Sequence, residues 1–461
     1  MNYTKKFPGR VNRTNMILEV IQHNTKNTNP IVCGRVVGLI DVENPAMGLE
    51  KAFLLKDDSG QMEVLSAELP QVGSIIEVRV MRATGDRFKQ DGEITVLAEC
   101  EDYFISPKES PNYRRLLIDA DLKRNLKIRS RIIQVIRTFF EQKGFVETET
   151  PCLVRLPGME PYLDLFKTRF EADFAADQKL SEDMYLITSP EYAMKKLLVG
   201  GMEKIFQITK SFRNKESFSE RHNPEFTIME WYRAYASYLE IMDDTEELVK
   251  FLWMHFGERD HQGDSLDMVV GDQKVDIMRT WRRIRVIEAF QEFAGIDEET
   301  FFDLEKFRVE VKSRGYVIGE KASFDDCFFT IFLNEIEPKL GFGVPVILYD
   351  YPVSMAALSK RCANDERFAE RFEAYIGGIE LCNAFTELND PDEQAKRLEL
   401  ERQERAGLGK DLYGVDQTFV EALRFGMPPS GGNALGIDRL VMLILGEKDI
   451  RNVLYFPHRD L

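Results

Sequence analysis

The sequence predicts an α+β protein in which a small β-barrel precedes a larger domain that mixes strands and helices. Short strand-like runs broken by turn residues occupy residues 31–105. Beyond a proline-containing linker at 106–115, helical and strand patterns are mixed without internal repeats. Because 461 residues suffice for one large catalytic domain and one smaller module, we divide the chain into a leader (1–30), a barrel (31–105) and a main domain (106–461).

The composition is that of an ordinary globular protein, with 44% hydrophobic and 11% aromatic residues. No run approaches the roughly 18 apolar residues of a membrane span, and the N-terminus has no apolar signal core, so we expect a cytoplasmic protein without a membrane partner. Six cysteines without CxxC spacing and five isolated histidines argue against a disulfide framework and a transition-metal site. The net charge of −17 disfavours nonspecific nucleic-acid binding by the whole surface, but leaves room for a local basic patch.

The leader is polar and basic, with five lysines and arginines against the single Glu19. Two interpretations stay open for it. It is either a basic arm for RNA or a loosely docked segment, and the second is the simpler interpretation.

The barrel is expected to contain five strands in about 75 residues, with a hairpin turn at Asp58-Ser59-Gly60. The string "FLLKDDSGQMEVL" resembles the OB-fold module placed ahead of many class II aminoacyl-tRNA synthetases. Such barrels bind single strands in a positive groove. Residues 31–105 hold seven lysines and arginines against fourteen acids, and counterion release needs cations. We therefore expect this barrel to be a poor reader of an anticodon.

The main domain opens with a predicted amphipathic helix in "LKIRSRIIQVIRTFFEQKGF". Its apolar face includes Ile128, Ile132 and Phe139. Gly144 ends the helix, and a strand leads on to Pro151.

The segment "SFRNKESFSERHNPEFTIMEWY", residues 211–232, predicts a strand, a loop and a returning strand, because Asn223-Pro224 would break a helix. On the returning strand one face carries Phe226, Ile228, Glu230 and Tyr232. A carboxylate in this apolar series needs a cationic partner.

The segment "RFEAYIGGIELCNAFTELNDP", residues 371–391, gathers further acids among aromatics. Glu373 and Glu380 lie seven apart, while Asn383, Phe385 and Glu387 alternate along one strand. Such acids would hold Mg²⁺, a substrate ammonium or an arginine. The alternative is an edge strand whose acids are solvated.

The segment "PPSGGNALGIDRLVMLILG", residues 428–446, is interpreted as a glycine-rich turn followed by a buried helix from Ile437 to Leu445. Arg439 stands near the start of that helix, where it can point back at a bound anion. Alone, a glycine-rich turn is more often a packing feature than a phosphate site.

Together, these segments resemble the three signature motifs of class II aminoacyl-tRNA synthetases, in particular the lysyl branch. The helix through Gly144 to Pro151 is similar to motif 1, "FRN…RHNPEFTIMEWY" to motif 2 and "GGNALGIDR" to motif 3, and the resemblance covers roughly residues 115–461. It implies an antiparallel sheet flanked by helices, a homodimer through motif 1, and ATP-dependent formation of an aminoacyl-adenylate.

The resemblance also implies the ATP end of the site. Arg213 would neutralise the α-phosphate and Arg439 the γ-phosphate. His222 and Phe226 would frame the adenine, and Asn383 with Arg213 would orient the amino acid's carboxylate. The family usually has Asn-Glu after the motif 2 arginine. This chain has Asn214-Lys215-Glu216, so Glu216 is the candidate for the missing contact to the adenine end. Glu373 and Glu380 would hold Mg²⁺.

The implied lysine pocket has seven members: Glu191, Glu230, Tyr232, Asn383, Phe385, Glu387 and Ala434. Glu230, Tyr232 and Glu387 would surround the ε-ammonium, Glu191 would take the α-amino group, and Phe385 would pack along the aliphatic stem.

The acceptor of the activated amino acid is open at this point. Several strings, and Ala434 where lysyl-tRNA synthetases usually have glycine, are closer to the elongation factor P lysine ligases. We therefore expect transfer of lysine or β-lysine to a lysine of elongation factor P. Transfer of lysine to tRNA is the alternative, because the ligases normally lack the barrel. A third class is a regulator with the same fold, but it would be expected to have lost an ATP arginine or a metal glutamate.

Overall fold

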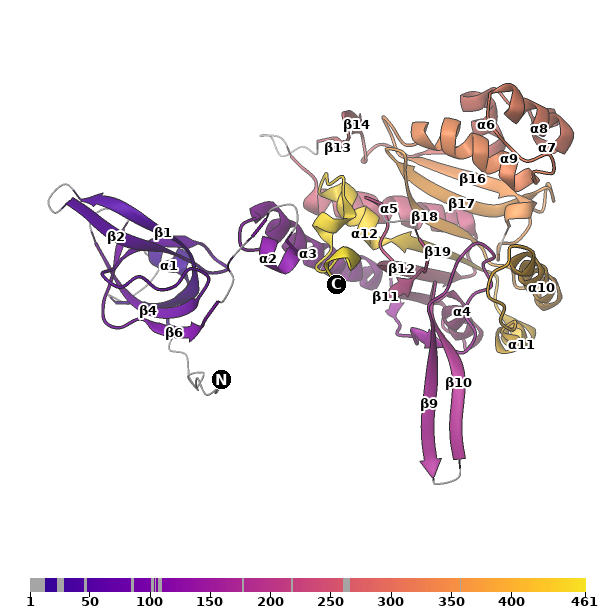
Figure 1. Ribbon diagram of the computed structural model, residues 1–461. Coiled ribbons are helices and arrows are strands. Elements are labelled where there is room, and N and C mark those ends of the chain that lie inside the picture. Colours follow the sequence, from indigo (N-terminus) through magenta and orange to yellow (C-terminus); the bar gives the residue numbers. More distant parts are fainter. Residues whose placement is uncertain are drawn as a thin grey trace. The chain divides into compact units, whose positions relative to one another are not determined.

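The computed structural model of the protein describes residues 13–22, 29–44, 48–83, 87–100, 103, 105–106, 110–175, 178–216, 219–259, 266–356 and 358–461. Two compact units, Met1–Ser110 and Pro111–Leu461, divide the chain (Figure 1). Most of the predicted basic leader, residues 1–12 and 23–28, lies outside the described residues. In the parts of the chain that are described, no helix has the length and apolarity to cross a membrane.

The first unit is the predicted small barrel. Its strands are β1 (Ile31–Asn44), β2 (Gly48–Lys56), β3 (Gln61–Leu65), β4 (Ile75–Arg82), β5 (Phe88–Gln90) and β6 (Thr95–Ala98). Pairing in the order β1-β2-β3-β5-β4 is closed by β1 pairing with β4, and β6 adds to β4. The expected hairpin joins β2 to β3, where the Asp57 carboxylate accepts hydrogen bonds from the backbone of Ser59 and Gly60.

A short helix of the leader, α1 (Ile17–Ile21), packs on this barrel. Ile17 and Val20 are buried in the barrel core, and the Ile17 backbone N–H donates to Asp57. This part of the leader is therefore docked by an apolar face and a hydrogen bond.

The second unit is built on an eight-stranded sheet, which confirms the predicted class of fold. Its strands in spatial order are β15 (Arg282–Arg285), β16 (Val346–Pro352), β17 (Phe368–Ile376), β18 (Ile379–Thr386), β19 (Ser430–Gly436), β12 (Glu225–Ala234), β11 (Lys204–Phe212) and β7 (Val146–Glu147). All neighbours are antiparallel except β15–β16 and β11–β7. The predicted strand-loop-strand over 211–232 is the pair β11–β12.

Helices cover both faces of this sheet (Figure 1). One core joins α3 (Ala120–Gln142), α5 (Tyr238–Phe256) and α12 (Ile437–Ile444) to the face that carries Met229 and Trp231. A second core joins α4 (Glu191–Val199), α10 (Pro391–Gly407) and α11 (Gln417–Gly426) to the opposite face, which carries Tyr232 and Phe385. Alternate side chains of β12 are thus buried in hydrophobic cores on the two opposite faces of the sheet.

The remaining elements form a third hydrophobic core and two small separate sheets. Helices α6 (Val286–Ala294), α7 (Glu298–Phe302), α8 (Leu304–Ser313) and α9 (Phe324–Ile331) form a third core with β15 and β16. Strands β8 (Leu153–Val154), β10 (Gln178–Leu186) and β9 (Lys167–Ala175) make a separate three-stranded sheet, and β13 (Met268–Val270) pairs with β14 (Gln273–Val275).

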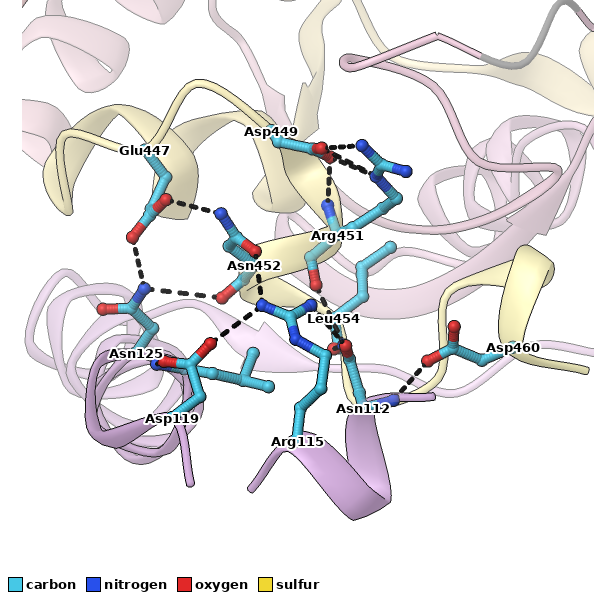
Figure 2. A network of polar contacts seen from close by, with 11 residues as sticks. Asn112, Arg115, Asp119, Asn125, Glu447, Asp449, Arg451, Asn452, Leu454 and Asp460 are labelled. Carbon is cyan, nitrogen blue, oxygen red and sulfur yellow. Dashed lines mark hydrogen bonds and ion pairs between the residues drawn. The ribbon is translucent and has the colours of Figure 1, made fainter. Parts of the chain in front are cut away.

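The long helix α3 behaves as its sequence predicts. Asp119 caps it by accepting from the Leu122 N–H, and Gly144 follows it with φ +78°, a left-handed conformation that glycine adopts without steric cost. Helix α3 and the preceding α2 (Asn112–Arg115) are fastened to the segment after α12 (Figure 2). The buried Asn112 donates to the Leu454 carbonyl, and Asn125 donates to Glu447.

The predicted glycine-rich turn is wrong: residues 430–436 form β19, a strand inside the sheet between β18 and β12. The glycines there serve close packing. A Cβ on Gly431 would lie 2.6 Å from the Ile241 side chain, so only glycine lets α5 approach the strand this closely. The helix predicted directly after this segment is confirmed as α12.

Candidate active site

A cavity of about 330 Å³ lies on the sheet face formed by β12, β18 and β19. Every side chain predicted from the sequence to act in the site lines this cavity, with the exception of Glu373. The cavity therefore joins segments that lie about 250 residues apart along the chain, from Glu191 to Arg439.

Strand register explains how the cavity floor is assembled. Glu230 on β12 pairs with Ala434 on β19, and Ala434 pairs with Asn383 on β18. Directly opposed residues of antiparallel strands point to the same face. The three side chains therefore form one row across the sheet, and Tyr232, Gly432 and Phe385 form the next row.

A β-bulge adds Glu380 to this face. Ala374 pairs with Cys382 and Tyr375 pairs with Glu380, so Leu381 is the extra residue of β18. Without a bulge, Glu380 and Asn383 would point to opposite faces, because their spacing is odd. With it, both line the cavity.

Glu230 is the buried acid at the closed end of the cavity. It is 1% exposed and accepts hydrogen bonds from Ser189 Oγ at 2.6 Å and Tyr232 OH at 2.8 Å. Burial, followed by the nearby Glu191 carboxylate, raises the pKa of Glu230 to about 8. The side chain is therefore held in place but lacks a full cationic partner.

Glu387 is the second buried acid and follows β18. Its Oε2 lies 2.5 Å from Lys195 Nζ, while its Oε1 has no hydrogen-bond partner in the described part of the chain. Burial raises the pKa of Glu387 to about 8 against the lowering effect of Lys195. The same Nζ lies 2.5 Å from Glu191 Oε1, so one protein lysine serves two of the three predicted ammonium-binding carboxylates.

The opposite end of the cavity is cationic. The guanidinium of Arg213 lies over the Phe226 ring at 5.1 Å, and its buried Nε has no hydrogen-bond partner among the described residues. Arg439 lies 3.4 Å from Glu380 and donates to His222 Nε2 at 3.0 Å. Because arginine only donates, His222 Nε2 accepts and its Nδ1 carries the proton toward Ser219 Oγ, 2.7 Å away. Burial and then Arg439 lower the pKa of His222, which keeps the ring neutral.

Lys215 stands between Asn214 and Glu216 in the loop that follows β11. Its φ is +56°, a left-handed conformation, and its side chain pairs with Asp164 at 3.1 Å outside the cavity. Glu216, by contrast, lines the cavity and lies 3.5 Å from Arg213. Lys215 is therefore turned away from the cavity, and the next residue, Glu216, faces it.

The two predicted metal ligands differ in their surroundings. Glu380 lines the cavity, whereas Glu373 is bound by Arg371 at 2.7 Å and by the hydroxyls of Tyr351 at 2.6 Å and Tyr375 at 2.5 Å. No cluster of three or more His, Cys, Asp or Glu side chains suited to a metal occurs among the described residues.

A third acid, Glu337, lies near this pair. Burial, and then Glu380 and Glu373, raise the pKa of Glu337 to about 7. Of these acids, Glu380 faces the cavity, and a single carboxylate there fits Mg²⁺ that arrives with a polyphosphate, because Mg²⁺ takes one or two carboxylates plus phosphate oxygens.

Sequence reasoning missed several residues that complete the site: Ser189, Lys195, Glu337 and Arg371. Ser189 stands two positions before Glu191, and Lys195 stands four positions after it, one helical turn away. The i,i+4 spacing was therefore a usable signal for Lys195. Glu337 gave no local signal, since only tertiary packing brings it near Glu380.

Taken together, the cavity is acidic at its closed end and cationic at the other. Such a cavity can hold a small cation against the three carboxylates and a polyanion against the two arginines.

Comparison with known proteins identifies a family and several sequence relatives of this chain. Residues 108–460 match the family described as "tRNA synthetases class II (D, K and N)". The chain is 35% identical to "Lysine--tRNA ligase" of Magnetococcus marinus over 433 residues, which cover 87% of this chain and 82% of the relative. It is 36% identical to "Lysine--tRNA ligase" of Carboxydothermus hydrogenoformans over 406 residues (84% and 78%). Against "Lysine--tRNA ligase" of Campylobacter jejuni it is 31% identical over 470 residues (96% and 89%).

Proposed function

The chain belongs to the class II tRNA synthetases of the D, K and N group, and from this premise we propose that it activates lysine with ATP and transfers the lysyl group to tRNA. The match makes it a ligase that forms an aminoacyl-adenylate. The amino acid and the acceptor are the parts that we propose.

The observation that carries lysine as the substrate is the excess of acid at the closed end. Among the described residues, Lys195 is the single cation that pairs with Glu191 and Glu387, no cation forms an ion pair with Glu230, and Glu387 Oε1 has no hydrogen-bond partner. Uncompensated buried carboxylates are costly unless a cation joins them. The ε-ammonium of lysine supplies that cation, and the Phe385 ring beside Lys195 gives this end an aromatic wall as well.

The chemistry requires no protein nucleophile. The lysine carboxylate oxygen forms a bond to the α-phosphorus while the bond from that phosphorus to the β-phosphate oxygen breaks, and pyrophosphate leaves. Arg213 neutralises charge at the α-phosphate and Arg439 at the terminal phosphate, because fixed guanidinium groups stabilise charge that develops in the transition state. Glu216 and Phe226 would hold the adenine, with neutral His222 orienting Arg439.

Glu380 and Glu373 are the residues that would hold Mg²⁺, which when bound neutralises the phosphates that leave. Because Arg371, Tyr351 and Tyr375 already donate to Glu373, Mg²⁺ would have to share the Glu373 carboxylate with these donors. Asn383 accepts from Arg371 at 2.9 Å, so its amide nitrogen is the donor that remains for the substrate carboxylate.

For the acceptor, the relatives support tRNA rather than elongation factor P. All three named above are lysine–tRNA ligases, and the first of them covers 87% of this chain, so the match extends beyond the main domain. Besides the strings noted above, Ala434 favours the protein acceptor, since its methyl group stands between Glu230 and Asn383 in the cavity floor.

The test is transfer of labelled lysine and labelled β-lysine, with ATP and Mg²⁺, to total tRNA and to purified elongation factor P in parallel. We expect label from lysine on tRNA. Label only on the protein would overturn the acceptor and favour the ligase interpretation. Label on neither, together with no lysine-dependent exchange of pyrophosphate, would indicate a regulator. Arg439→Ala is the impaired control.

We also propose that the protein is a homodimer through α3, as motif 1 implies. Size-exclusion chromatography with light scattering would give twice the chain mass of 53.4 kDa. A monomer at micromolar concentration would contradict this.

A further inference from the structure

Lys195 is a fully buried lysine at the centre of the acidic end of the cavity. It belongs to α4, one turn after Glu191, and its Nζ lies 2.5 Å from both Glu191 Oε1 and Glu387 Oε2. Its ammonium also lies 5.2 Å from the Phe385 ring centroid. Burial alone would lower the pKa of Lys195, but the Glu191 and Glu387 carboxylates raise it above the ordinary value. The ammonium is therefore permanently charged.

Lys195 joins the two places where the substrate's ammonium groups are expected. Glu191 would receive the α-amino group, and Glu387, with Glu230, the ε-ammonium. Because these three carboxylates carry one more negative charge than lysine has ammonium groups, they are balanced only when Lys195 is included. An unbalanced buried carboxylate would take up a proton instead.

We propose that Lys195 is the positioning residue of the lysine pocket, which holds Glu191 and Glu387 apart and favours their ionised forms, so that two negative charges become available when the substrate's two ammonium groups bind. This assignment rests on the proposed function, since it takes lysine as the ligand. Lys195 does not itself touch the reacting atoms and acts through the two glutamates.

The acids that face Lys195 come from three elements. Glu191 lies on the same helix, Glu230 comes from β12, and Glu387 follows β18. Among the described residues, Lys195 is the only cation that forms an ion pair with any of the three glutamates.

The next layer around Lys195 is aromatic and acidic. Helix α11 contributes the uncharged ring of Phe419, 6.0 Å from Nζ. Further out, Glu160 and Glu401 act on one another and on Glu191, and each of the two also faces an arginine, Arg213 and Arg397 respectively. Burial raises the pKa of both outer acids, and the two arginines offset that rise only in part.

Removal of the Lys195 charge has a definite sign. Lys195 lowers the pKa of Glu387, so its loss leaves that pKa above the present value of about 8. Glu387, which is already largely protonated near pH 7 in the free site, would then be ionised in a still smaller fraction, so its ionisation on binding of the ε-ammonium would cost more free energy. Lysine binding should weaken, and it should recover as the pH rises. When a carboxyl pKa that already lies above the pH rises by one, its ionised fraction falls about tenfold.

The experiment is lysine-dependent ATP–pyrophosphate exchange across the pH range, on wild type, Lys195→Met, Lys195→Arg and Lys196→Met. Lys196 is the matched control, because it is the next residue of the helix and pairs outside the pocket with Asp416 at 2.8 Å. For Lys195→Met we expect the KM for lysine to rise about tenfold or more, the KM for ATP to stay within twofold, and the profile of kcat/KM for lysine to move to higher pH. Lys195→Arg keeps the charge and should keep the wild-type profile.

Other outcomes would overturn the assignment. If Lys195→Met lowers kcat and thermal stability while the pH profile and the ratio of the two KM values stay unchanged, Lys195 is only structural. If Lys195→Met does not fold, Lys195→Gln, which keeps a hydrogen-bond donor without the charge, must show the same pH shift. Wild type without lysine-dependent exchange would overturn the proposed function itself, whereas active wild type with an unshifted variant overturns the role of Lys195 alone.

Discussion

Gly432 and Glu387 lie so close that no side chain fits between them. A Cβ on Gly432 would lie less than 3.0 Å from Glu387 Oε1 and from Cε1 of Tyr232. The glycine is therefore what lets the acid that follows β18 reach across the neighbouring strand into the lysine pocket.

Gly432→Ala should damage lysine binding selectively. The new methyl group must displace Glu387 or Tyr232, and both are confined in a packed core. We expect the KM for lysine to rise at least about tenfold, which corresponds to about 1.4 kcal/mol, with little change in the KM for ATP. The measurement is lysine-dependent pyrophosphate exchange.

Gly407→Ala is the control for this substitution, because a Cβ at Gly407 would meet nothing within 4 Å. Equal KM values for lysine in Gly432→Ala and wild type would contradict the close approach seen here.

Lysine binding should release protons at neutral pH. Burial raises the pKa of Glu230 and of Glu387 to about 8, so both are largely protonated in the free site near pH 7. An ammonium group favours the ionised carboxylate and lowers both pKa values, so protons leave as lysine enters. Affinity should fall as the pH falls below about 8 and level off above about pH 9.

Calorimetry in buffers of different ionisation enthalpy measures this release directly. Near neutral pH the observed heat should depend on the buffer, and Glu230→Gln should release fewer protons than wild type. A heat independent of the buffer near neutral pH would show that both carboxylates are already ionised in the free site.

Arg439→Ala should impair the chemical step and ATP binding. The guanidinium is held by Glu380 and by neutral His222 at the open end of the cavity. We expect kcat to fall roughly 10²–10³-fold, the size of effect seen when one charge-stabilising donor is removed. Arg439→Lys should rescue poorly, because an ammonium lacks the forked donor geometry of a guanidinium.

Arg424→Ala is the matched control for this effect, since Arg424 pairs with Asp392 on the surface at 3.3 Å. If Arg439→Ala raised the KM for lysine instead of the KM for ATP, the assignment of lysine to the acidic end of the cavity and of ATP to the cationic end would be reversed.

Arg129→Met should destabilise the main domain. Arg129 on α3 is buried, lies 2.6 Å from Asp438 Oδ1 and donates to Thr227 Oγ1 at 2.9 Å. It thereby joins α3, β12 and α12. Loss of one partner leaves a buried charge unpaired, which costs roughly 3–5 kcal/mol. Urea unfolding measures the change in the free energy of unfolding.

Arg137→Met on the same helix supplies the comparison. Arg137 pairs with Glu147 at 2.9 Å near the surface, so its removal should cost about 0–1 kcal/mol. Similar losses for the two variants would mean that the buried ion pair stabilises no more than an exposed one.

The elements of the main domain follow from local sequence patterns. The apolar repeat of α3, the alternation of Glu230 and Tyr232 with Trp231, and the buried helix after Gly436 all arise from side-chain periods that each segment carries itself. The acids at apolar positions also predicted, from the sequence alone, buried carboxylates that need a cationic partner.

Only the tertiary structure decided how these pieces meet. The row of Asn383, Ala434 and Glu230 depends on strand register between segments about two hundred residues apart, which no local pattern records. The bulge at Leu381 turns Glu380 toward the cavity, although its odd spacing from Asn383 would place the two side chains on opposite faces. The segment expected as a turn is the strand β19, whose Gly431 and Gly432 leave room for α5 and for Glu387. The placement of Lys195 between Glu191 and Glu387 likewise depends on packing between segments that are distant along the chain. The sequence determined which charges the protein carries, and the folding of distant segments together determined which of them neutralise one another and which are left for the substrate.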